Sequence, residues 1–271
     1  MRVLIITQNE PFYIPKMIRH ILSHQNNDFK VVGYTVLKPH RKNKSMKDWF
    51  MERAKIYSLL ELFYVLSCAA FVKFCSLLKL PYYSNKDIFS RYGVQPFNSD
   101  DINSDEYLRK IKANNIDIIV SISCPQLFKE RILKAPNLVC LNAHGTLLPK
   151  HRGVFGTWWT LNNEDKEAGG TIHTMELKLD AGEIVWQKAF PVTSSDTQFS
   201  LAYKTKKDMA YGLVETMKKY KAGAVKNLPA VFESSYHRAP TKEMGIEFHK
   251  RGKRVIMLKD IPDMLSIRYK D

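Results

Sequence analysis

The first part of the chain alternates short apolar runs with segments whose apolar residues recur at helical spacing. The runs Val3–Ile6, Lys30–Val36 and Ile116–Ser123 are rich in β-branched residues and are predicted to be strands. Between them, Ile14–Leu22 and Ser104–Ala113 have the periodicity of amphipathic helices. This alternation of strand and helix predicts an α/β fold with a doubly wound, mostly parallel sheet.

The second part of the chain starts with the same pattern and then changes. After Tyr220 the sequence is basic and is predicted to be irregular, with no internal repeat and no low-complexity linker. We therefore predict a core of residues 1–195 and a smaller C-terminal extension of residues 196–271. Further predicted elements are the helices Gln126–Leu133, Phe155–Leu161 and Thr197–Tyr220 and the strands Leu138–Leu141, Thr171–Met175 and Ile184–Val192.

One segment, Ile56–Leu80, is apolar for long enough to be weighed as a membrane element. Its longest uncharged stretch is Leu62–Val72, bounded by Glu61 and Lys73. That stretch is much shorter than the roughly 20 residues of a spanning helix, so no transmembrane span is predicted. A helix that lies on a membrane surface stays open, but we favour one that packs on the sheet or in a homodimer interface.

The length of the chain and its cysteines limit the number of domains and the cellular compartment that can be expected. A chain of 271 residues with 45% hydrophobic residues holds one large domain, or one domain with a small appendage. Its four cysteines show no metal-ligand spacing, which predicts free thiols in a reducing compartment, no metal site and a cytoplasmic location. The start, Met1–Thr7, has a strand pattern and not that of a signal peptide.

The net charge of +15 raises the question of an anionic partner. Seven Lys and Arg residues lie in Lys38–Lys55 against Asp48 and Glu52, and sixteen against eight acidic residues in 204–271. Such charge suits RNA, a phosphorylated substrate or an anionic membrane surface. Because no RNA-binding motif accompanies it, we favour an ordinary solvated surface and regard nucleic acid as the less favoured partner.

Candidate chemistry gathers where the predicted strand Leu138–Leu141 ends. Asn142 and His144 are two residues apart, so both side chains lie on one side if the strand continues through them. The carboxyl ends of strands are where open α/β sheets place their ligands. Asp180 lies in a turn-prone Asp-Ala-Gly segment, from which its carboxylate can reach His144. An amide, an imidazole and a carboxylate suit acyl transfer, as oxyanion donor, general acid/base and orienting group.

This set of residues resembles the folate-dependent formyltransferase family, which includes glycinamide ribonucleotide, methionyl-tRNA and nucleotide-sugar N-formyltransferases. The resemblance spans roughly residues 1–195 and departs from the family at Gly145-Thr146. It implies a Rossmann-like core that transfers a formyl group from 10-formyltetrahydrofolate to an amine. The residues that carry it are Asn142, His144, the Leu147–Pro149 turn, Arg152-Gly153, the Gly170–His173 strand and the Leu179–Gly182 loop.

The resemblance also implies roles for individual residues. Asn142 and a protonated His144 would donate hydrogen bonds to the oxyanion, and Asp180 would favour the imidazolium and help to relay the proton. The pterin of the formyl donor would lie against backbone in two segments, with a plain strand-to-helix turn as the alternative for the first. These donor-binding residues are Cys124, Pro125, Gln126 and Leu127 in one segment and Leu179 and Asp180 in the other.

Other candidate residues carry weaker signals. Lys150 and Arg152 could meet a phosphate or carboxylate of the substrate, or be solvated loop charges. Cys124 has no base placed beside it by the sequence, so a nucleophile is disfavoured. His173 is expected to be structural. The adjacent pair Trp158-Trp159 could stack a base or sugar, but core packing is favoured.

The first turn and the C-terminal part bear on the acceptor. Thr7–Phe12 contains no GxGxxG or Walker pattern, and it lacks the glycine-rich phosphate loop of the glycinamide ribonucleotide enzymes. The C-terminal part is expected to be short for the barrel of methionyl-tRNA formyltransferases. We therefore expect a small phosphorylated amine, most favourably a nucleotide-linked amino sugar. The alternatives are methionyl-tRNA formylation, or a basic RNA- or membrane-surface-binding module on a degenerate fold.

Overall fold

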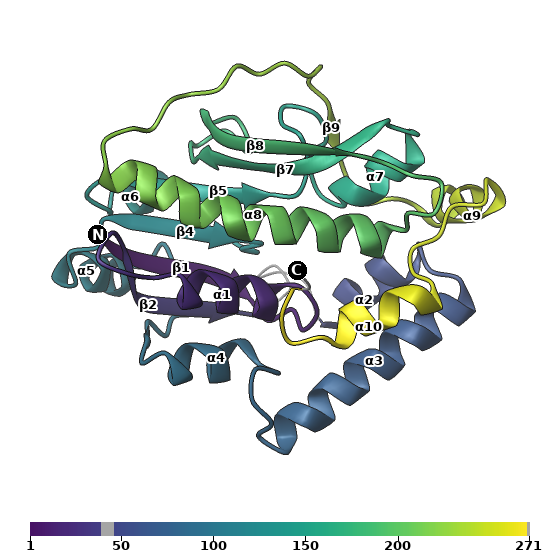
Figure 1. Cartoon of the computed structure of the whole chain (residues 1–271), viewed down its shortest axis with the longest axis horizontal. Helices are drawn as coiled ribbons and strands as arrows, with labels where there is room; N and C mark the ends of the chain where they lie inside the picture. Colours follow the sequence, from purple (N-terminus) through teal and green to yellow (C-terminus); the bar gives the residue numbers. More distant parts are fainter. Residues whose placement is uncertain (39–45, 270–271) are drawn as a thin grey trace.

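A seven-stranded sheet forms the centre of the computed structural model, which describes residues 1–38 and 46–269 (Figure 1). Its strands are β1 Arg2–Gln8, β2 Lys30–Leu37, β3 Gln95–Pro96, β4 Ile118–Ile122, β5 Val139–His144, β7 Glu167–Thr174 and β8 Ile184–Pro191. They lie in the order β3-β2-β1-β4-β5-β7-β8, with the first five parallel and β7 and β8 antiparallel. Two short strands, β6 Arg152–Gly153 and β9 Tyr236–His237, pair separately. The predicted α/β class with a mostly parallel sheet is confirmed.

Helices cover both faces of this sheet. On one face α1 (Ile14–Ser23) and the long α8 (Gln198–Lys221) lie side by side, as Figure 1 shows. On the other face α5 (Asp105–Ala113) and α6 (Glu130–Leu133) contribute to a second apolar cluster. The remaining helices are α2 Met46–Ala54, α3 Leu59–Leu77, α4 Asn85–Arg91, α7 Gly156–Asn162, α9 Lys242–Lys250, the short 3-10 helix Leu258–Asp260 and α10 Ile261–Leu265.

The continuous apolar run of β1 explains this double coverage. Val3 and Ile5 point into the cluster under α1 and α8, whereas Leu4 and Ile6 point into the cluster under α5 and α6. All four side chains are fully buried. A strand that is apolar on both sides can only be stable at the centre of a sheet with two covered faces.

Two element predictions differ from the structure. The helix predicted over Gln126–Leu133 begins only at Glu130, because the side chain of Gln126 binds the backbone of Asp100 and Ile102 and holds a loop. The segment after Tyr220 was predicted to be irregular, but it contains α9 and α10. Thr241 caps α9, and Phe248 on that helix is fully buried against Trp158.

The predicted boundary at residue 195 stays a prediction. The extension begins with α8, and the apolar face of that helix, including Leu213 and Met217, belongs to the main core beneath the sheet. The adjacent pair Trp158-Trp159 is buried, as favoured from the sequence. Of the predicted basic block, residues 39–45 lie outside the described part of the chain.

The long apolar segment forms α3, at the lower right of Figure 1. It packs beside α10, and its Cys68 belongs to the main apolar cluster. The predicted alternative of a homodimer interface stays a prediction. By length and composition alone α3 could cross a membrane, with a mean hydropathy of 1.7 over a window of which 22% is buried. Its first turn is tied to the protein, because the buried Glu61 accepts from the backbone N–H of the N-cap Ser58 and lies 2.6 Å from His249. That it does not span a membrane stays a prediction.

Candidate active site

The side chains of Asn142 and His144 leave the carboxyl end of β5 on the same side of the sheet. Leu141 and Ala143, with which they alternate, point into the core under α8. Asn142 and His144 therefore face the side of the sheet that carries α5 and α6. Both are half-buried, as expected of groups at the edge of a site.

The amide of Asn142 is oriented by a histidine on the neighbouring antiparallel strand. Asn142 Nδ2 lies 3.1 Å from His173 Nε2, and His173 Nδ1 lies 2.7 Å from the carbonyl oxygen of Thr174. The carbonyl can only accept, so Nδ1 carries the proton and Nε2 accepts from the amide. Burial, with a contribution from His144, lowers the pKa of His173 to about 4, so this neutral tautomer persists at neutral pH. Among the described residues the second N–H of Asn142 has no partner.

His144 lies between a carbonyl oxygen and a carboxylate. Its Nε2 is 3.2 Å from the carbonyl oxygen of His151, and its Nδ1 is 3.5 Å from Asp180 Oδ1. Both neighbours accept hydrogen bonds, so an imidazolium is the form of His144 that can donate to both. The three residues predicted to act together thus lie together in the structure.

Asp180 is held in place by backbone. It is 8% exposed, and its Oδ2 accepts a hydrogen bond of 3.0 Å from the N–H of Gly153. Gly153 has φ +103°, and a Cβ there would lie 2.2 Å from the carbonyl oxygen of His237. A residue with a side chain would displace either this N–H or β9, so glycine is required for this contact.

A second histidine–aspartate pair lies behind the first. His151 Nε2 is 2.5 Å from Asp165, and Lys150 Nζ is 2.7 Å from the other oxygen of that carboxylate. Burial opposes the charge, but these two partners hold the pKa of Asp165 below its usual range. The pair fixes the loop whose carbonyl binds His144. Lys150, which was predicted to meet the substrate, instead forms an ion pair with Asp165 in this loop.

The loop after β4 supplies the first predicted donor-binding segment. Burial raises the pKa of the Cys124 thiol to about 12, so it stays protonated and is a poor nucleophile. Leu127 is 69% exposed in the same loop, and Leu177 and Leu179 near Asp180 are also exposed. Exposed leucines in both predicted donor-binding segments are chemically suited to a flat heterocycle.

The amino-terminal end of α1 already holds an anion. Both carboxylate oxygens of Glu10 accept from the backbone N–H groups of Phe12, Tyr13 and Ile14, at 2.8 to 3.0 Å. This is the position at which many α/β proteins bind a phosphate. The Glu10 carboxylate takes that place here, in agreement with the absence of a glycine-rich loop.

Two cationic side chains lie near the carboxyl edge of the sheet. Lys206 on α8 donates to Ser123 Oγ at 2.9 Å, just beyond β4. Burial lowers its pKa to about 8, against an opposing effect of Glu10. The buried Nε of Arg152 makes no hydrogen bond within the described structure. Lys206 was not predicted, since nothing in the sequence of α8 distinguishes it from its neighbours Lys204 and Lys207.

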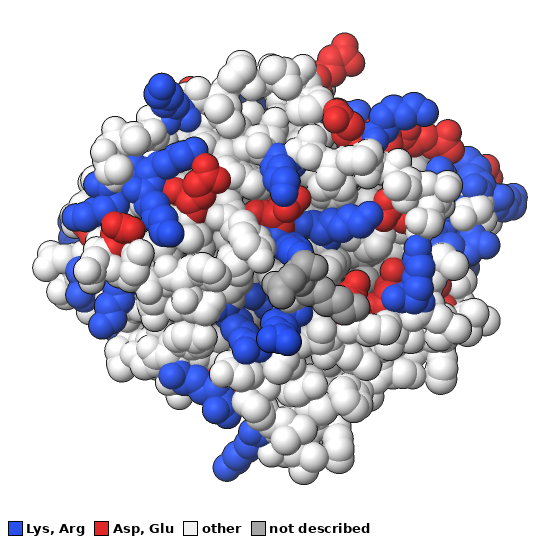
Figure 2. Space-filling model, viewed as in Figure 1, with Lys and Arg blue, Asp and Glu red and all other residues white. Residues whose placement is uncertain are grey.

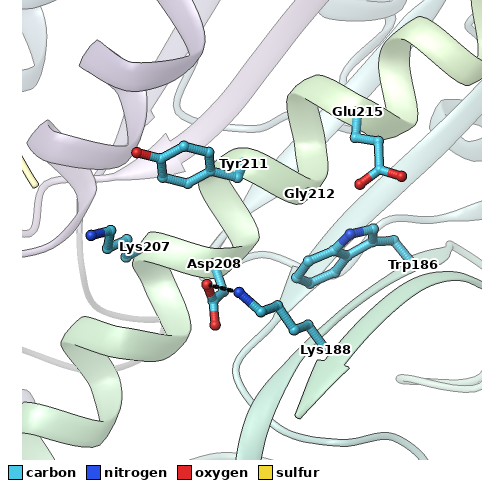
Figure 3. Close-up of a pocket in the computed structure, with 7 residues that line it drawn as sticks. All are labelled: Trp186, Lys188, Lys207, Asp208, Tyr211, Gly212 and Glu215. Atoms are coloured by element: carbon cyan, nitrogen blue, oxygen red, sulfur yellow. Dashed lines mark hydrogen bonds and ion pairs between the residues drawn. The ribbon is translucent and has the colours of Figure 1, made fainter. Parts of the chain in front are cut away.

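A separate hollow lies between β8 and α8, shown in Figure 3. Trp186 and Tyr211 are among its lining residues, and Lys188 and Asp208 form an ion pair of 2.7 Å in it. Trp186 pairs in register with Ile172, which points into the core under α8. The hollow is thus on the opposite face of the sheet from Asn142 and His144.

Among the described residues, no group of three or more His, Cys, Asp or Glu side chains could hold a metal ion.

Comparison with known proteins places these residues in a family. A sequence model described as formyl transferase matches residues 80–217, which include all the predicted catalytic and donor-binding residues. The methionyl-tRNA formyltransferase of Kosmotoga olearia is 32% identical over 173 residues, covering 63% of this chain and 55% of that relative. The chain spans about half the length of the methionyl-tRNA formyltransferases of Kosmotoga olearia and Caldanaerobacter subterraneus, with which it is compared.

Solved structures share the fold over most of the chain. A sugar N-formyltransferase from Shewanella superposes with a TM-score of 0.58 at 20% identity, covering 98% of this chain and 87% of that one. An N-formyltransferase from Helicobacter canadensis, in complex with folinic acid and dTDP-3-aminofucose, gives a TM-score of 0.56 at 17% identity. That match covers 88% of this chain and 71% of the other.

Proposed function

The chain belongs to the formyl transferase family, and from that premise we propose that it transfers a formyl group from 10-formyltetrahydrofolate to an amine. The observation that carries the proposal is the arrangement at the end of β5. There Asn142 has one free amide N–H, and His144 lies between the His151 carbonyl and the carboxylate of Asp180. Such a set can stabilise an oxyanion and move a proton.

In the proposed acyl transfer, Asn142, His144 and Asp180 have different roles. A neutral amine forms a bond to the formyl carbon, and the carbonyl electrons move onto oxygen. The free N–H of Asn142 donates a hydrogen bond to this oxyanion. The ring of a protonated His144 turns away from the His151 carbonyl, and its Nε2 donates a second hydrogen bond to the oxyanion. The bond from the formyl carbon to the folate nitrogen then breaks as the protonated His144 gives a proton to that nitrogen. The proton lost by the amine returns His144 to its starting form, and Asp180 stabilises the imidazolium.

The formyl donor fits two segments at the edge of the sheet. Residues 124–127 follow β4, and Leu177–Asp180 follow β7. Their exposed leucines offer apolar contact to a pterin, and the backbone beside them offers donors and acceptors for its edge. When bound there, the donor supplies the activated formyl group, while the protein supplies position and charge stabilisation.

We further propose that the acceptor is the amine of a nucleotide-linked amino sugar, formylated in the cytoplasm. The structural match to a sugar N-formyltransferase extends over nearly the whole chain, including the segment after α8. Glu10 occupies the end of α1, where a glycinamide ribonucleotide enzyme needs its phosphate site. Arg152 and Lys206 supply cations that suit a diphosphate.

Methionyl-tRNA is the second candidate acceptor. It is favoured by the 32% identity to the Kosmotoga olearia enzyme and by the net charge of +15, which suits a polyanion. A tRNA presents many backbone phosphates, whereas a sugar nucleotide presents one diphosphate. The two acceptors are therefore distinguishable by the salt dependence of the reaction.

A direct assay tests the proposed reaction. Purified protein with 10-formyltetrahydrofolate and a panel of dTDP- and UDP-linked amino sugars should give an N-formyl product by mass spectrometry. His144→Ala and Asn142→Ala should each lower turnover by ~10²-fold or more, because an oxyanion donor is lost. His24→Ala removes an exposed histidine far from the site and serves as the matched control. Near wild-type turnover in a folded His144→Ala protein would remove that residue from the mechanism.

A further inference from the structure

The outward face of α3 is apolar along its whole length, and no described element covers it. Its large side chains are between 45% and 88% exposed: Leu59, Leu60, Phe63, Leu66, Phe71, Phe74 and Leu77. A helix that is apolar all round is normally buried. An exposed apolar surface of this kind marks an interaction site in a soluble protein.

The inward face of α3 holds the helix against the protein. Cys68, Val72 and Cys75 are buried on this face. At its first turn Glu61 also accepts from the backbone of Val255, at 2.7 Å, and binds His249. Removing α3 from the protein would leave the Glu61 charge without these partners. A partner must therefore meet the helix from the side, along its exposed face.

The exposed charges on α3 and its flanking turns, residues 54–86, are positive. Four lysines between residues 54 and 86 are exposed, namely Lys55, Lys73, Lys79 and Lys86. The single acidic residue in the same range is Glu61, which is buried. The lower right of Figure 2, where Figure 1 places α3, shows a broad surface almost without charged side chains of either sign. The segment thus combines a broad apolar surface with four exposed lysines.

A groove of about 620 Å³ adjoins the beginning of α3. Ser58, the N-cap of α3, is one of its lining residues. Its apolar lining includes Tyr57 and Ile246, and its cationic groups include Lys55, Lys242 and Lys250. Of these, Lys250 lies 4.0 Å from the exposed Glu247. An apolar floor with lysines around it suits an acyl chain below a phosphate headgroup.

We propose that the outward face of α3 and the adjoining groove bind the surface of a lipid bilayer that carries anionic headgroups. The helix axis lies in the plane of the membrane, with the phenylalanines in the acyl boundary and the lysines at the headgroups. A second copy of the chain is a poorer match. A two-fold contact through α3 would bring like-charged lysines together, and within residues 54–86 the one carboxylate is that of the buried Glu61.

Vesicle co-sedimentation tests this proposal on the full chain. The protein should bind vesicles that contain phosphatidylglycerol, bind pure phosphatidylcholine vesicles much more weakly, and be released by high salt or carbonate. The double variant Phe63→Gln/Phe74→Gln should lower the partition coefficient by ~10²-fold, about tenfold for each ring withdrawn from the acyl boundary. Lys73→Gln/Lys79→Gln should lower it about fivefold per lysine on anionic vesicles.

The control is Leu138→Gln, a substitution of an equally exposed apolar residue just before β5. It should leave vesicle binding unchanged, and formylation of a soluble acceptor should be unchanged in all three variants. Absence of binding to anionic vesicles would overturn the proposal. So would a stable dimer in light scattering that the phenylalanine variant dissociates, which would assign the face to a second copy. Release by detergent alone would instead indicate a spanning helix.

Discussion

The tautomer of His173 should control both the stability of the fold and the orientation of Asn142. The side chain is buried, donates from Nδ1 to the Thr174 carbonyl and accepts from Asn142 at Nε2. Protonation of Nε2 would set two donors against each other at 3.1 Å. We therefore expect acid to weaken the fold and the active site through the same atom.

The size of the effect follows from the depressed pKa. In the unfolded chain His173 titrates near its ordinary pKa of about 6.5, whereas burial lowers the folded pKa to about 4. Between these values the unfolded chain binds more protons, so stability is complete above pH ~6.5 and falls as the pH drops towards ~4. At ~1.4 kcal/mol per pKa unit the total is ~3 kcal/mol.

Urea unfolding of wild type and His173→Phe across this pH range measures the effect. The variant should be less stable at neutral pH by ~1–3 kcal/mol, because the Thr174 carbonyl and the Asn142 amide each lose a partner. Its stability should, however, lose the share of the acid dependence that comes from His173, while the share from His20, whose pKa burial also lowers to about 4, remains. His173→Gln, which can still accept from Asn142, should recover much of the turnover. Equal acid dependence in wild type and His173→Phe would refute this account of His173.

Two further predictions concern charged groups that the structure places unexpectedly. Lys206→Met should raise the KM for a phosphorylated acceptor about tenfold, with a smaller change in kcat. In wild type the affinity for that acceptor should fall above pH ~8, because Lys206 loses its proton there. An unchanged KM in steady-state kinetics would remove Lys206 from the acceptor site. Glu61→Gln should cost ~2 kcal/mol in urea unfolding, since charged hydrogen bonds to His249 and Val255 are lost. Glu61 holds the pKa of His249 above its usual value, so the wild-type contribution is present at lower pH and is lost as the pH rises through that raised pKa. Equal alkaline dependence in Glu61→Gln would contradict this.

The catalytic set was predictable because its signals are local. Strand alternation places Asn142 and His144 on one side, and turn chemistry places Asp180 in a loop. The structure brings these three together, while their catalytic roles stay predictions. The predicted strands and the long helix α8 are also local, because each has a clear apolar period and Thr197 caps α8.

The supporting residues could not be predicted in the same way. His173 meets Asn142 only through the antiparallel register of β5 and β7, which no short segment specifies. Lys206 reaches Ser123 because α8 packs on the sheet from 83 residues away in the chain. The helix α9 was missed because its stability depends on Phe248 packing against Trp158, a contact that is distant in sequence. Such tertiary contacts override weak local propensity.

The most direct test of the central claim is the choice of acceptor. Formylation should be measured with 10-formyltetrahydrofolate, using amino-sugar nucleotides and charged initiator tRNA as separate acceptors, at salt concentrations of ~50 and ~200 mM. At least one amino-sugar nucleotide should be formylated, with only a small loss of kcat/KM at the higher salt concentration. Efficient, steeply salt-dependent formylation of the tRNA, with no activity on any sugar nucleotide, would contradict that claim.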